Sequence, residues 1–146
     1  MESRRLFAVP PMEGMFEGIR LDWLDPGDRD DRSFLIRAEH PELARALRDD
    51  AEEVEVDGAR FNPRLHLTLH ETVAAQLWDD DPPEVWHAAC RLLDAGYDRH
   101  EVFHMLGSAA ASEIWNALHE GKPYDRERYV RALNALPGSW EAQRPR

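Results

Sequence analysis

The sequence predicts an all-α protein, a small bundle of about five to six helices with one short β-hairpin-like segment near residues 54–61. Two observations support this fold class. In most segments after residue 32, apolar residues recur at intervals of three and four, as on one face of a helix. Capping residues, prolines and glycines mark the ends of these segments. With 146 residues, 42% of them apolar, the chain can form one domain with a hydrophobic core.

The first part of this pattern predicts two short helices and a hairpin. One helix is expected from Ser33 to Glu39 and is interrupted at His40-Pro41, because a residue before proline disfavours the helical conformation. The next is expected from Pro41 to Asp49, with proline at a permissive first position. From Val54 to Phe61 the apolar period changes from four to two around Asp-Gly, which predicts a hairpin.

The second part predicts four helices, each with a recognisable start. An asparagine cap and a first-turn proline begin the first of them, and an aspartate with a glutamate three residues later begins the longest. Glycine or proline follows the end of three of them. The expected helices run from Asn62-Pro63 to Trp78, from Pro82-Pro83 to Ala95, from Asp98 to about His119, and from Asp125 to about Leu136.

Three regions are expected along the chain. Residues 1–32 form an N-terminal arm and an acidic connector, residues 33–137 a helical metal-binding-like domain, and residues 138–146 a C-terminal tail. The arm has little regular pattern, although some apolar residues recur at helix-like intervals. We expect it to dock on the body of the protein or on a partner.

Composition excludes several classes of function. The formal net charge of −11 argues against binding to nucleic acid or to an anionic membrane surface, because both need clustered Lys and Arg. There is neither a signal-peptide pattern at the N-terminus nor an apolar run of membrane length. The single cysteine, Cys90, excludes an intrachain disulfide and a thiolate zinc cluster. We therefore expect a soluble cytoplasmic protein, with a protein partner or a homo-oligomer left open.

Two histidine pairs, His66 with His70 and His100 with His104, carry the functional prediction. The four-residue spacing places the two side chains of each pair on one face of a helix, and both pairs continue apolar seams. If the two helices pack in parallel, the pairs are offset along the axes by roughly 3 Å, so four imidazoles can converge. We therefore expect one divalent transition-metal ion, zinc first, with copper, iron and nickel as alternatives.

Two glutamates lie next to these histidines in the sequence, and each can take one of several roles at a metal site. Glu71 and Glu101 can bind the ion, orient an imidazole through a hydrogen bond, or act as a base. Residues 100–104 also form a His-Glu-x-x-His motif, so a zinc-dependent hydrolase or peptidase with Glu101 as catalytic base is an alternative. A catalytic zinc keeps one open position, whereas four histidine ligands close it. Neither the substrate nor enzymatic activity follows from the motif alone.

A third alternative is a metal-free adaptor. Its histidines would be hydrogen-bonded polar plugs in the bundle, and its Trp-rich surface and N-terminal arm would bind another protein. Other chemically capable residues are set aside. His40 precedes a proline at a turn, His87 is expected in solvent, His119 lies at a helix C-terminus, and Cys90 is expected in the core.

Several of these motifs together resemble a bacterial family, domain of unknown function 1841. In that family an Asn-Pro start leads into a paired-histidine helix, and a His-Glu-x-x-His helix follows. The resemblance covers roughly residues 33–136 and implies a helical bacterial protein, without an established activity, substrate or cofactor. The positions that carry it here are Asn62, Pro63, His66, His70, His100, Glu101 and His104, followed by Glu113-Ile114-Trp115 and Gly121-Lys122-Pro123-Tyr124-Asp125.

Overall fold

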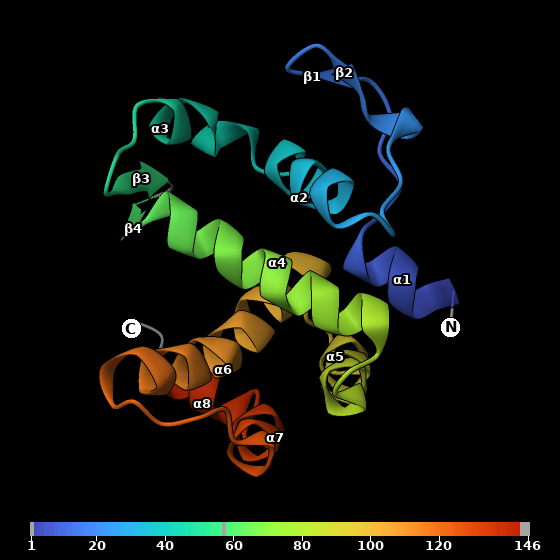
Figure 1. The fold of residues 1–146 in the computed structure, drawn as a ribbon. Helices are drawn as coiled ribbons and strands as arrows, with labels where there is room; N and C mark the ends of the chain where they lie inside the picture. Colours follow the sequence, from blue (N-terminus) through green and yellow to red (C-terminus); the bar gives the residue numbers. More distant parts are fainter. Residues whose placement is uncertain (1, 57, 144–146) are drawn as a thin grey trace. The chain divides into compact units, whose positions relative to one another are not determined.

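The computed structural model describes residues 2–56 and 58–143 and confirms a mainly helical fold (Figure 1). In this part of the chain there are eight α-helices, somewhat more than expected, and two short antiparallel hairpins. In chain order the elements are α1 (Glu2–Ala8), β1 (Met15–Phe16), β2 (Ile19–Arg20), η1 (Leu21–Trp23), α2 (Arg29–Ala38), η2 (Pro41–Leu43), α3 (Ala44–Arg48), β3 (Val54–Val56), β4 (Ala59–Phe61), α4 (Pro63–Asp79), α5 (Pro83–Asp94), α6 (Arg99–His119), α7 (Arg126–Asn134) and α8 (Gly138–Gln143).

The chain divides into two compact units, residues 1–71 and residues 72–146. Helix α4 begins in the first unit and ends in the second. The three-region division expected from the sequence stays a prediction. Among the helices that the structure describes, none is both long and apolar enough to cross a membrane.

The first unit contains short helices and both hairpins. The β1–β2 hairpin turns through Glu17 and Gly18, which both have positive φ, as its tight turn requires. The predicted hairpin at 54–61 is confirmed: Val54 pairs with Phe61, while Asp57 lies outside the described residues. The buried apolar residues of this unit are Ala8, Val9, Leu21, Leu35, Ile36, Ala38, Leu43, Ala46 and Leu67.

In the second unit, α5, α6 and α7 contact one another. On α5 the buried residues Val85, Ala88, Ala89 and Leu92 recur at helical intervals, so one face of that helix lies in the core. Helix α6 buries Val102, Phe103, Met105 and Leu106 in consecutive turns. From α7 the core receives Tyr129 and Leu133.

The predicted helix starts at Asn62, Asp98 and Asp125 are confirmed by hydrogen bonds. The side chain of each accepts from the backbone N–H three residues later, at distances of 2.9, 2.8 and 3.1 Å. These bonds satisfy N–H groups that lack a partner within the helix.

Four elements lie where no regular structure was expected: α1, the β1–β2 hairpin, η1 and α8. Helix α1 has only seven residues, too few to be stable alone, and its last residue, Ala8, and the following Val9 are buried. Helix α8 occupies the region expected to be a tail, directly after Pro137. Helix α2 begins at Arg29, four residues before the expected Ser33, with two aspartates in its first turn that favour a helix N-terminus.

Candidate metal centre

Three histidines of the first unit, His40, His66 and His70, form a cluster that can hold a metal ion. Each offers one ring nitrogen, and the three nitrogens all lie within 4.8 Å of one another. The ring centroids of His40 and His70 are 4.4 Å apart, those of His66 and His70 are 4.7 Å apart, and those of His40 and His66 are 5.3 Å apart. In the described part of the chain this is the only group of three or more His, Cys, Asp or Glu side chains with such geometry.

Helix α4 supplies two members of the cluster. Its start is set by the Asn62 cap and by Pro63 at the first helical position, which places His66 and His70 in its first three turns. The four-residue spacing brings both rings to one face, as predicted from the sequence. Phe61, the last residue of β4, lies against His66 with ring centroids 4.7 Å apart.

The third member, His40, comes from the end of α2. Helix α2 stops here because the following residue is Pro41, and His40 itself has a non-helical backbone with φ −123° and ψ 57°. Its Nδ1 lies 2.8 Å from the carbonyl oxygen of Ile36. A carbonyl oxygen only accepts hydrogen bonds, so Nδ1 carries the proton and Nε2 is left with the lone pair that a metal ion requires.

Two of these three imidazoles are buried. His40 is 4% exposed and His70 is 8% exposed, and the Nε2 atom of His70 is enclosed by protein. An imidazole binds a transition metal through the lone pair of a ring nitrogen. Three nitrogen donors without a thiolate suit zinc, copper, iron or nickel.

The second histidine pair lies in the other unit. His100 and His104 are in the first two turns of α6, with ring centroids 4.2 Å apart. His104 is half-buried, but His100 is exposed rather than core-facing, because it is the second residue of the helix. A site shared with His66 and His70 would join residues of both units, and it stays a prediction.

The two predicted glutamates have different surroundings. Glu101 is half-buried in the first turn of α6, where its backbone N–H donates to the Asp98 side chain. Glu71 is half-buried and lines a cavity that no histidine lines. Their roles as ligand, orienting group or base stay predictions.

Sequence reasoning set His40 aside because it precedes a proline, and the structure brings it into the cluster. Local periodicity cannot reveal a contact between the end of one helix and a later helix. The sequence signal for this member of the site was therefore only the presence of a further histidine at position 40. The other residues set aside lie outside the cluster. His87 is exposed, His119 stacks on Trp115, and burial raises the pKa of the half-buried Cys90 thiol.

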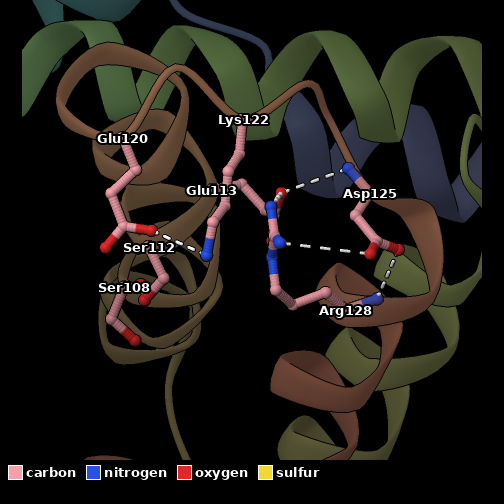
Figure 2. A network of polar contacts seen from close by, with 7 residues as sticks. All are labelled: Ser108, Ser112, Glu113, Glu120, Lys122, Asp125 and Arg128. Carbon is pink, nitrogen blue, oxygen red and sulfur yellow. Dashed lines mark hydrogen bonds and ion pairs between the residues drawn. The ribbon is translucent and has the colours of Figure 1, made fainter.

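A separate polar network joins α6 to α7 in the second unit (Figure 2). The Glu113 side chain is 7% exposed and accepts two hydrogen bonds from Arg128, one from Nε at 2.5 Å and one from Nη2 at 2.9 Å. It also accepts from the backbone N–H of Asp125 at 3.3 Å. The hydrogen bonds from Arg128 hold the pKa of Glu113 below its ordinary value. Glu113 is therefore a structural ion-pair partner of Arg128.

The outer part of this network is exposed. Lys122 pairs with Glu120 at 2.8 Å, and both residues belong to the loop between α6 and α7. Ser108 and Ser112 donate to backbone carbonyls of α6 itself. These contacts fasten a loop and a helix end, and they gather no set of metal ligands.

Fold and site together define a small, mainly helical protein with a partly buried three-histidine cluster. The chain belongs to the family described as Domain of unknown function (DUF1841), whose model matches residues 30–135. The resemblance seen in the sequence motifs is thereby confirmed. Comparisons with curated proteins and with solved structures gave no match.

Proposed function

We propose that the chain binds one divalent transition-metal ion, zinc first, through His40, His66 and His70. The observation that carries this proposal is the convergence of three histidine nitrogens within 4.8 Å of one another. Two of the three side chains are almost fully buried. A divalent cation among these rings would bind one nitrogen of each and so offset part of their loss of hydration.

The distances are compatible with one shared ion. Zinc–nitrogen bonds of about 2.0–2.1 Å put two ligand nitrogens of a tetrahedral site about 3.4 Å apart. The observed upper limit of 4.8 Å is larger by an amount that small rotations of the imidazole rings can close. The hydrogen bond from His40 Nδ1 to Ile36 fixes the orientation of one ring, as is usual for metal-binding histidines.

Three histidine ligands would leave a coordination position for water or a small anion. Zinc bound in this way lowers the pKa of its water and can act as a Lewis acid. The ion would also connect the end of α2 to α4, so that its binding would stabilise the fold of the first unit. The proposal therefore includes both a stabilising role and an open position for chemistry.

Calorimetric titration of full-length protein purified without a histidine tag tests the proposal. We expect binding of about one zinc ion per chain, with a loss of affinity of at least about tenfold in H66Q and in H70Q, since each removes a ligand. H87Q is the matched control, because His87 is exposed and outside the cluster. Absence of saturable zinc binding, or a loss of zinc affinity in H87Q equal to that in H66Q and H70Q, would refute the proposal.

Two further variants separate this site from the four-histidine site expected from the sequence. The cluster described above predicts that H40Q loses zinc while H104Q retains it. The four-histidine alternative predicts the reverse. Because His40 is buried, circular dichroism must show that H40Q keeps its helical content before its zinc titration is compared.

A further inference from the structure

The first unit contains an open surface cavity of about 420 Å³ that is distinct from the histidine cluster. A volume of this size is within the range of small-molecule sites. Its walls come from α2, α3 and α4, and no histidine lines it. The lining residues that matter here are Arg37, Leu47, Arg48, Arg64, Leu67 and Glu71.

Three arginines line this cavity although the chain as a whole carries a net charge of −11. Arg37 pairs with Glu17 at 2.9 Å, and Arg64 pairs with Asp50. Among the described residues, Arg48 has neither an ion pair nor a side-chain hydrogen bond. Its guanidinium is therefore the group that remains available for an anionic ligand, and its planar donors match a carboxylate.

The remaining lining residues restrict the charge and the polarity of the ligand. Glu71 contributes one negative charge, and within the described part of the chain it has no ion pair. This carboxylate disfavours a ligand that brings two or more negative charges. Leu47 and Leu67 provide apolar surface beside the arginines, and Leu67 is 6% exposed. Apolar surface next to a single available cation suits an amphipathic ligand.

We propose that this cavity binds a small organic anion with one negative charge and an apolar body. The carboxylate of the ligand pairs with Arg48, and its apolar body lies against Leu47 and Leu67. This site does not depend on the histidine cluster, so metal binding and anion binding can fail separately.

Binding of hexanoate to full-length protein, followed by two-dimensional NMR, tests the proposal. Hexanoate has one carboxylate and an apolar chain, acetate lacks the chain, and hexylamine has the chain with the opposite charge. We expect saturable shifts with hexanoate at residues 44–48 and 64–71, and binding of acetate that is weaker by about tenfold, since several methylenes are missing. Hexylamine should give no saturable shifts in these segments.

Variants identify the residue that holds the carboxylate. R48Q should weaken hexanoate binding by about tenfold or more, because it removes a charge-assisted pair. E71Q should strengthen binding by a few fold, because it removes a repelling charge. The matched control is R45Q: Arg45 is on the same helix, pairs with Asp49 at 3.7 Å and does not line the cavity.

Three results would overturn the assignment. One is hexanoate binding that does not saturate below about 10 mM, which is weaker than a specific site of this kind should give. The second is equal weakening in R48Q and R45Q, which would indicate a general effect of positive charge. The third is tighter binding of inorganic phosphate than of hexanoate, which would contradict a singly charged, amphipathic ligand. If R48Q fails to fold, a decrease of affinity in E71Q would equally refute the proposal.

Discussion

Replacing Glu113 with glutamine tests the ion pair that joins α6 to α7. Glutamine keeps the size of the side chain but removes the charge, and its amide group cannot accept both hydrogen bonds from Arg128. Breaking a buried pair costs about 3–5 kcal/mol. The Arg128 side chain is 30% exposed, so solvent screening reduces this cost, and for the Glu113 substitution we expect about 2 kcal/mol. At about 3 °C per kcal/mol, the melting temperature should fall by about 6 °C.

The stability difference between the wild-type chain and E113Q should also depend on pH. The pKa of Glu113 is lowered in the folded protein, chiefly by the hydrogen bonds from Arg128. Its contribution to stability is therefore complete above the unfolded-state pKa of about 4.3 and is lost as the pH falls through the lower folded-state pKa. The difference between the wild-type chain and E113Q should be constant near neutral pH and should shrink below about pH 4.

Thermal unfolding followed by circular dichroism from neutral to acidic pH measures both effects. E120Q is the matched control, because Glu120 is an exposed carboxylate that also pairs with a cation, Lys122. We expect E120Q to melt close to the wild-type temperature, since exposed pairs contribute little. An E113Q protein as stable as the wild type, or a difference that grows as the pH falls, would refute the reasoning.

Three further predictions concern the core and the site. Y129F removes a buried hydroxyl that donates to the Gln76 side chain at 2.7 Å. The free energy of unfolding measured in urea should therefore fall by about 1–2 kcal/mol, and an unchanged value would contradict a stabilising role of this hydrogen bond. E101Q should keep its zinc stoichiometry in a calorimetric titration, and loss of the ion would place Glu101 among the ligands. Bound zinc should be released to a chromophoric indicator as the pH falls, because protons compete for the imidazole nitrogens, and retention at about pH 4 would argue against histidine ligation.

The long helices were predictable because their signals are local. The side chains of Asn62, Asp98 and Asp125 accept the capping hydrogen bonds that the sequence suggested. The short elements were not predictable in the same way. A seven-residue helix such as α1 is too short to be stable alone and depends on the burial of residues such as Ala8, which periodicity does not report.

The candidate site was predictable in part for the same reason. The pairing of His66 with His70 follows from their spacing on one helix, and the structure places their rings together. The contribution of His40 is a tertiary contact made by the end of another helix, so no local pattern contains it. The cavity beside Arg48 likewise requires three helices to be placed together before it can be recognised.

X-ray absorption at the metal edge of the zinc-loaded, untagged protein tests the central claim most directly. Scattering from imidazole rings counts the histidines on the ion. With His40, His66 and His70 as ligands, we predict three imidazoles and at least one oxygen ligand from water. Four imidazoles, a sulfur ligand, or a chain that retains no zinc would contradict the account.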